Sequence, residues 1–106
     1  MMKKILIVLL LVLAILAFGY FLLKPVKSYS MDEIAKHASR EDCWMVIEGS
    51  VYDVTKFIPM HKGKDAILFG CGKDATEMFN NRPNGSGSHS SMARSIMKKF
   101  AIGKVN

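Results

Sequence analysis

Acidic residues are missing from the first 27 positions of the chain, and residues 5–23 carry no charge of either sign. Residues 1–27 hold four lysines and so have a charge of +4, whereas residues 28–106 hold eleven basic and nine acidic residues and add only +2 to the formal total of +6. Most of the excess positive charge therefore flanks the apolar residues 5–23. Its expected partner is the anionic lipid headgroup, and a nucleic-acid partner is not expected.

The uncharged residues 5–23 have the length that a membrane span needs. As a helix rising about 1.5 Å per residue they extend about 28 Å, close to the roughly 30 Å thickness of the hydrocarbon core. A cleaved signal peptide with its site at Ala17-Phe18-Gly19 would fit the same start, but the apolar run continues past that site. We therefore predict a single-pass signal anchor that contacts membrane lipid.

Lysines lie on both sides of this segment, so charge alone orients it weakly. The basic tail of residues 1–4 is short and is expected to stay in the cytoplasm, which places the rest of the chain outside it, in the periplasm if the source is bacterial. Pro25 ends the helix and residues 24–29 form a tether. Residues 30–106 remain for one small domain whose thin core needs a cofactor or a crosslink.

Only two cysteines, Cys43 and Cys71, are available for a crosslink. They could be two buried thiols or one disulfide, and an extracytoplasmic location would favour the disulfide. Metal binding by this pair is not expected.

Short elements are expected throughout the domain. Residues 44–47 and 51–54 are β-rich runs around Glu48-Gly49-Ser50 and predict a hairpin, with burial on both faces. Short helices are expected over residues 30–38, 55–60, 65–70 and 74–80, and residues 83–88 read as a loop. Ser90 can cap a last helix whose apolar positions fall at helical spacing: Ala93, Ile96, Met97 and Phe100.

Two histidines, His61 and His89, stand in predicted turns and could reach one metal from opposite sides. A lone histidine is more often a surface or capping residue, which is how we interpret His37. A planar macrocycle also needs an apolar slot, although such residues are more often plain core. The candidates for the slot are Ile47, Val54, Phe57, Ile67, Leu68, Phe79, Ala93 and Ile96.

Six short motifs occur in a specific order between Tyr29 and Val105. They are Trp44 with its following strand, Val51-Tyr52-Asp53-Val54-Thr55-Lys56-Phe57, His61-x-Gly63, Asp74-Ala75-Thr76-Glu77-x-Phe79, His89-Ser90-x-x-Ala93 and Phe100-x-Ile102-Gly103. In this order they resemble the cytochrome b5 haem-binding domain. The resemblance implies an α+β fold with a small mixed sheet and short helices that form a haem pocket.

The same resemblance implies a non-covalent haem b with His61 and His89 as axial ligands. It further implies that Trp44 lies in a second core away from the haem, that Ser90 bonds a propionate, and that Phe57 and Phe79 line the pocket. Two neutral imidazoles would fill both axial positions and leave none for oxygen or a substrate, so the iron could only exchange electrons. We therefore predict an electron carrier and not an enzyme. Neither cysteine lies in the Cys-x-x-Cys-His arrangement of covalent haem attachment.

Other functions are compatible with this type of domain. One alternative is an adaptor or sensor that binds haem or another small ligand without redox turnover, like the steroid-binding relatives of cytochrome b5. Those relatives lack the pair of histidines, which favours electron transfer here. A structural domain that has lost haem is a third reading, supported only by an altered turn at His61.

The chain departs from the family pattern at this turn and in loop lengths. The usual His-Pro-Gly-Gly is His61-Lys62-Gly63-Lys64 here, the stretch from His61 to Asp74 is a residue shorter, and that from Asp74 to His89 is several residues longer. Met92 is close enough in sequence to be an alternative to His89. A His/Met pair would raise the reduction potential.

Charge around the expected haem edge also differs from the family. Family members that dock basic partners present acidic residues there, whereas this chain has more basic than acidic residues in the corresponding segments. We therefore expect an acidic or neutral redox partner, with a solvated surface as the alternative. The residues concerned are Lys62, Lys64, Lys73 and Arg82 against Asp65, Asp74 and Glu77.

The resemblance also bears on the two cysteines. It implies that Cys43 begins one strand and that Cys71 precedes a short strand beside it, which brings the two thiols together. The disulfide remains the favoured alternative.

Overall fold

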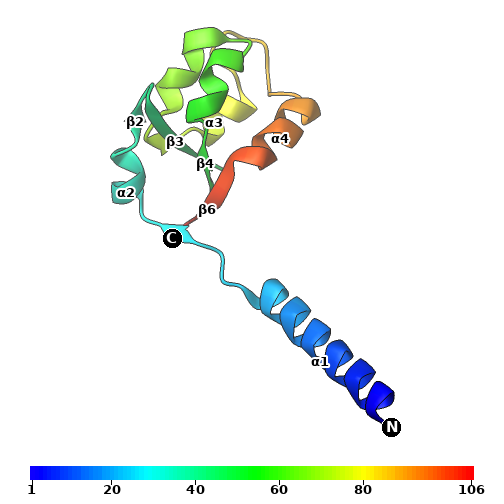
Figure 1. Ribbon diagram of the computed structural model, residues 1–106. Helices are drawn as coiled ribbons and strands as arrows, with labels where there is room; N and C mark the ends of the chain where they lie inside the picture. Colours follow the sequence, from blue (N-terminus) through cyan, green and yellow to red (C-terminus); the bar gives the residue numbers. More distant parts are fainter.

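Helix α1 (Met2–Leu23) projects away from the folded domain, as Figure 1 shows, and the computed structural model describes all 106 residues. The molecule measures 70 × 29 × 22 Å because of this projection. No residue of α1 is buried, and the helix is long and apolar enough to cross a membrane. It ends at Leu23 because Pro25 forces Lys24 into an extended conformation, with ψ at 122°.

Six strands form one mixed sheet in the order β1-β6-β4-β3-β2, with β5 paired to β3. They are β1 (Ser28–Tyr29), β2 (Ala38–Ser39), β3 (Asp42–Ile47), β4 (Ser50–Asp53), β5 (Lys73–Asp74) and β6 (Ala101–Val105). The predicted hairpin is confirmed as β3 and β4, joined by Glu48 and Gly49 at φ 51° and 79°. Two positive φ angles give the tight turn that matches the twist of paired strands.

Strand β1 consists of Ser28 and Tyr29, which we predicted to be part of the tether, residues 24–29. Ser28 and Tyr29 pair in parallel with Lys104 and Val105 of β6. Local sequence could not predict this strand, because two residues without periodicity gain their conformation only from a partner far along the chain. The connection between α1 and the sheet is consequently limited to residues 24–27.

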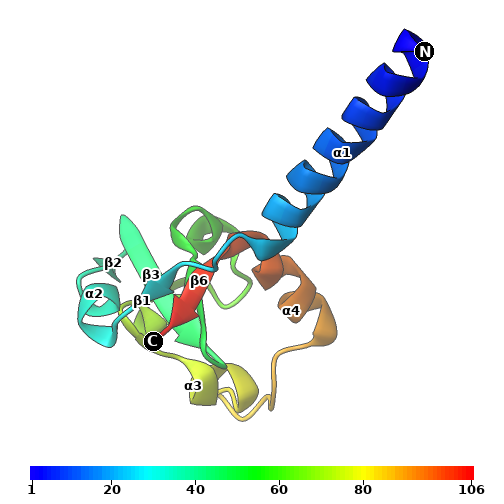
Figure 2. The ribbon, with the colours of Figure 1, turned by 90° about the horizontal axis from the view of Figure 1, so that it is seen from below.

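Short helices surround the sheet (Figures 1 and 2). They are α2 (Met31–Ala35), η1 (Thr55–Met60), η2 (Lys64–Gly70), α3 (Thr76–Asn80), α4 (Ser91–Met97) and η3 (Lys98–Phe100), where η marks a 3-10 helix. The predicted cap of α4 is confirmed, since Ser90 Oγ accepts from Ala93 N–H, and Ser30 Oγ caps α2 in the same way by accepting from Glu33 N–H. Helix α2 is shorter than predicted, because Ala38 leaves it to pair in β2.

Two hydrophobic clusters lie on the sheet. The larger contains Cys43, Met45 and Phe79, and the smaller is formed by Ile34, Val46 and Val51, with Trp44 packed against it. The implied second core around Trp44 is thus confirmed. The sheet with its short helices is the expected α+β fold.

A disulfide joins Cys43 of β3 to Cys71, the residue after η2. Their Cα atoms lie 4.9 Å apart and both residues are buried. The pairing of β5 with β3 directly beyond Cys71 brings the two segments together. The thin core is therefore crosslinked.

Candidate functional site

His61 and His89, which are 28 residues apart in sequence, face each other in the structure. Their ring centroids lie 6.4 Å apart with an interplanar angle of 29°, and both residues are half-buried. His61 is the residue at which η1 ends, and His89 directly precedes Ser90, the N-cap of α4. Two short helices thus bring the two imidazoles to one place.

Each imidazole is held by a hydrogen bond from Nδ1. The His61 Nδ1 lies 3.2 Å from the carbonyl oxygen of Lys64, and the His89 Nδ1 lies 2.8 Å from that of Phe79. A carbonyl oxygen can only accept, so Nδ1 is the donor in both rings, and in the neutral tautomer Nε2 is left with its lone pair. Histidines that bind metals are oriented by this kind of contact.

The separation of the rings fits one metal atom between them. Metal–imidazole bonds are about 2 Å long and each ring centre lies about 1 Å beyond its nitrogen, so two coaxial ligands have centroids about 6 Å apart. The observed 6.4 Å is close to that value. The donor set is the one that a bis-histidine haem requires.

Aromatic rings support both histidines. Phe79 stacks on His89 with centroids 4.3 Å apart and planes 5° apart, while Phe57 meets His61 edge-on at 6.0 Å. Phe100 lies 5.4 Å from Phe57. A planar apolar ligand between the imidazoles would contact this aromatic wall.

The apolar residues predicted for the slot divide into two groups. Ile47, Val54 and Phe79 are buried in the larger cluster, and Phe57, Ile67 and Leu68 pack against it. Ala93 and Ile96 lie half-buried on α4.

The larger cluster and its packed neighbours include apolar residues that were not predicted as site residues, among them Ile58, Met97 and Phe100. The helical spacing of Met97 and Phe100 from Ala93 was the signal that could have found two of them.

A polar network joins the elements around His89. Arg94 Nη1 donates to Glu48 Oε2 at 3.2 Å and Arg94 Nη2 donates to Asn80 Oδ1 at 2.7 Å, while Asn80 Nδ2 donates to Glu48 Oε1 at 3.2 Å. The hydrogen bond from Asn80, then the hydrogen bond and charge of Arg94, lower the pKa of the Glu48 carboxyl. The Arg94 guanidinium also lies 5.0 Å over the Phe79 ring.

The altered turn at His61 has a specific backbone. A Cβ at Gly63 would lie 2.8 Å from His61 Cε1, so a side chain at this position would displace the imidazole. Lys64 has a φ of 53°, the left-handed region that favours glycine, and its carbonyl is the one that holds His61. Lys64 thus holds a left-handed backbone conformation at a cost in strain.

Two further predictions concern the neighbours of His89. Ser90 Oγ accepts from Ala93 N–H at 3.1 Å, which leaves its own hydroxyl proton free to donate. Met92 is 71% exposed in the first turn of α4. Its position does not favour it over His89 as a ligand.

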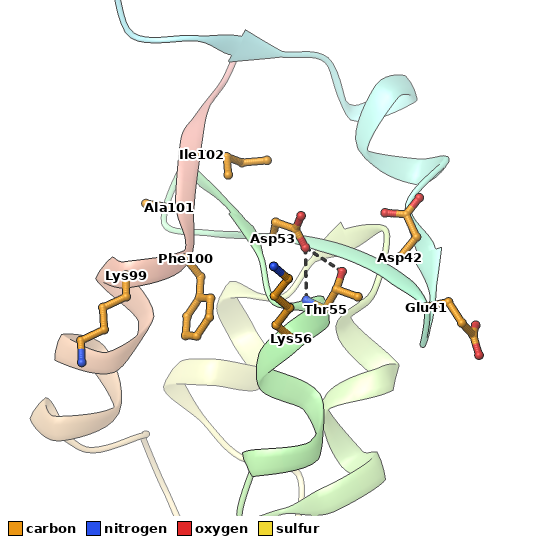
Figure 3. Close-up of a pocket in the computed structure, with 9 residues that line it drawn as sticks. All are labelled: Glu41, Asp42, Asp53, Thr55, Lys56, Lys99, Phe100, Ala101 and Ile102. Atoms are coloured by element: carbon orange, nitrogen blue, oxygen red, sulfur yellow. Dashed lines mark hydrogen bonds between the residues drawn. The ribbon is translucent and has the colours of Figure 1, made fainter.

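A surface cavity of about 400 Å³ lies elsewhere on the domain (Figure 3). Neither His61 nor His89 lines it. Its Asp53 accepts hydrogen bonds from the backbone and hydroxyl of Thr55, as Figure 3 shows. His37, interpreted from sequence as structural, bonds the cavity residue Asp42 and stacks on Trp44 at 3.6 Å.

Comparisons of the sequence with known proteins point to one family. A family model described as Cytochrome b5-like Heme/Steroid binding domain matches residues 30–106. Over 81 residues the chain is 41% identical to Cytochrome b5 of Oryza sativa subsp. japonica and 41% identical to Cytochrome B5 isoform D of Arabidopsis thaliana. These matches cover 76% of this chain and 56% and 54% of those proteins, so the chain spans about half the length of these relatives.

Solved structures give the same result. Ectothiorhodospira vacuolata cytochrome b558, described as a prokaryotic homologue of cytochrome b5, is similar with a TM-score of 0.72 and 34% identity, covering 76% of this chain and 99% of that one. Cytochrome b5 of Ostreococcus tauri virus 2 is similar with a TM-score of 0.61 and 42% identity, covering 72% and 81%.

Proposed function

This chain belongs to the cytochrome b5-like haem/steroid-binding family, and from that membership we propose that it is a membrane-tethered b-type cytochrome. Its cofactor is haem b, as in the cytochromes b5 that it resembles. His61 and His89 are the proposed axial ligands. The proposed role is to carry single electrons between membrane-associated redox partners, as a carrier and not as an enzyme.

The observation that carries this proposal is the pair of anchored imidazoles. Both Nδ1 atoms bond carbonyl oxygens, which leaves both Nε2 atoms available to bind a metal, and the ring centroids lie 6.4 Å apart. When bound, haem b supplies a one-electron couple at its iron. His61 and His89 would hold the haem iron between them, and with both imidazoles bound the iron would have no open position for a substrate.

An absorption spectrum of the full chain in detergent, reconstituted with haemin, tests the ligands. We expect a sharp low-spin spectrum in oxidised and reduced forms for the wild type, lost in His61→Ala and in His89→Ala. The control is His37→Ala, which removes an imidazole stacked on Trp44 and should keep the spectrum. A high-spin wild-type spectrum that binds carbon monoxide readily would indicate an open iron and the adaptor or sensor function instead.

Membrane attachment is the second part of the proposal. Residues 5–23 are proposed as the span, residues 1–4 as its cytoplasmic tail and residues 30–106 as the haem domain on the other side. The buried disulfide supports this orientation, because disulfides persist in oxidising compartments. Protease added to intact cells or spheroplasts should remove the haem domain, and full protection would contradict the orientation.

The redox partner is proposed to be acidic. Lys62, Lys64 and Lys73 are exposed, whereas Asp65 is paired with Arg40 at 2.9 Å and Asp74 caps Thr76. This balance supports a positive rim that steers an acidic surface to the haem edge. Electron-transfer rates to an acidic partner should fall as salt rises, and rates independent of salt would contradict the proposal.

A further inference from the structure

Strand β1 ties the segment that follows α1 into the sheet. Lys104 N–H donates to Lys27 O at 2.9 Å, and Asn106 N–H donates to Tyr29 O at 3.0 Å. Residues 24–27 alone lie between the end of α1 and this pairing. Four residues extend at most about 14 Å, so the sheet edge stays close to the end of α1 (Figure 2).

Gly103 makes the docking of β1 possible. A Cβ at this position would lie 2.5 Å from Lys27 O and 2.8 Å from Tyr29 Cε2. The first of these atoms is backbone and cannot rotate away, so any side chain at position 103 must push β1 off β6.

The docked edge is basic. We define the β1–β6 edge as residues 24–29 and 101–106, which contain Lys24, Lys27 and Lys104 and no acidic residue. All three lysines are exposed and none forms an ion pair.

Carboxylates lie near both ends of β6. Ala101 and Ile102, at its start, line the surface cavity together with Glu41, Asp42 and Asp53. At the end that carries Lys104, the hairpin turn with Glu48 reaches the edge through Gly49 O, which accepts from Val105 N–H at 3.0 Å. The Glu48 carboxylate is paired with Arg94, so it does not offset the lysines.

From this geometry we infer that the β1–β6 edge rests on the anionic headgroups of the bilayer that α1 enters. The inference depends on the membrane attachment proposed above. Lysines within a Debye length of about 8–10 Å of an anionic surface are attracted to it, and the short four-residue connection lets the lysines of the edge come that close to the bilayer. A bilayer is the one anionic surface that the position of α1 brings to this edge.

The contact gives the domain one orientation. Helices η1 and η2 lie at the end of the domain opposite α1 in Figure 1, so the segment that ends at His61 faces away from the bilayer. The haem edge next to His61 is thereby presented to a partner's water-exposed domain.

Acylation of lysines in nanodiscs tests the inference. The full haem-loaded chain is incorporated into discs of phosphatidylcholine alone or with phosphatidylglycerol, treated briefly with a membrane-impermeant amine reagent, and analysed by mass spectrometry. Lys104 should react at least roughly threefold more slowly in the anionic discs, with the difference lost at about 1 M salt. Lys62, next to His61, should react equally in both and serves as the reference.

Two variants separate the edge contact from simple tethering. In Gly103→Ala, β1 should leave β6, so Lys104 should lose its protection while Lys27, attached directly to the anchor, keeps it. Six Gly/Ser residues inserted after Val26 should remove the protection of Lys104 and of Lys27, which then lies beyond the insertion, without altering the fold. Gly19→Ala is the matched control, because a Cβ there meets nothing within 4 Å.

The outcomes distinguish this inference from the proposed function. Equal reactivity of Lys104 in both disc types, or unchanged protection in the insertion variant, would overturn the membrane-resting edge. Failure of the chain to enter discs at all would instead overturn the membrane attachment, and with it the inference. The low-spin spectrum, recorded on the same samples, reports whether each variant keeps its fold.

Discussion

Arg94 on α4 is bonded to Asn80 on α3, with 2.7 Å between Nη2 and Oδ1, across the extended loop that ends at His89. The same guanidinium lies over Phe79, the ring on which His89 stacks. One side chain therefore holds together the two helices that flank the proposed second ligand.

Replacing Arg94 should loosen this region. Arg94→Gln loses the cation–π contact and weakens the bond to Asn80, so the free energy of unfolding should fall by about 1–2 kcal/mol. Urea unfolding of the haem-loaded chain, monitored by the Soret absorption band, measures this loss of unfolding free energy. Arg40→Gln removes the same charge from an exposed pair with Asp65 and should cost less than about 1 kcal/mol. Equal losses in both variants would contradict a special role for Arg94.

The lowered pKa of Glu48 makes part of the stability depend on pH. A carboxyl whose pKa is lower in the folded state stabilises the fold above its unfolded pKa of about 4.3, and the gain is lost as pH falls through the folded value. The difference in Tm between wild type and Glu48→Gln should therefore be present at neutral pH and shrink below about pH 4. Glu77→Gln, which removes an unpaired carboxylate, is the control. A difference that did not change with pH would refute this link.

The left-handed Lys64 predicts a stabilising substitution. Lys64→Gly should relieve the backbone strain while keeping the carbonyl that bonds His61, and should raise the free energy of unfolding by about 1 kcal/mol. Denaturant unfolding of the haem-loaded chain checks this. Lys62→Gly, at a position without positive φ, should instead be neutral or destabilising. A loss of stability in Lys64→Gly would contradict this prediction. It would show that the lysine side chain stabilises the fold by more than its left-handed backbone destabilises it.

The disulfide should contribute strongly to the stability of this thin domain. The double variant Cys43→Ala and Cys71→Ala should lose about 2–4 kcal/mol of unfolding free energy, and reductant should lower the Tm of the wild type but not of the variant. Alkylation without reductant, followed by mass measurement, should find no free thiol in the wild type. Two alkylated cysteines would rule out the crosslink and remove its support for an extracytoplasmic domain.

Local chemistry made part of this structure predictable. The hairpin around Glu48 and Gly49 and the caps at Ser30 and Ser90 follow from nearest neighbours along the chain, and the structure contains all of them. The meeting of His61 and His89 was expected from the family resemblance, since 28 residues of separation carry no geometric signal of their own.

Features that depend on distant partners were not predictable. Strand β1 forms only when it pairs with β6. The hydrogen bonds from each histidine Nδ1 to the carbonyls of Lys64 and Phe79 form only after the backbone around those residues has folded. The bond of Arg94 to Asn80 likewise joins residues that only the folded chain brings together. Such contacts are set by tertiary packing, which local patterns do not encode.

The docking of β1 on β6 also has a mechanical consequence. If the domain is pulled away from its anchor, the force enters through β1 and runs along the strand. The bonds of Lys104 to Lys27 and of Asn106 to Tyr29 then share the load in shear and must break together, which resists force better than opening one bond at a time. A partner that binds and releases the domain repeatedly would therefore strain this short strand before it disturbs the histidine pair.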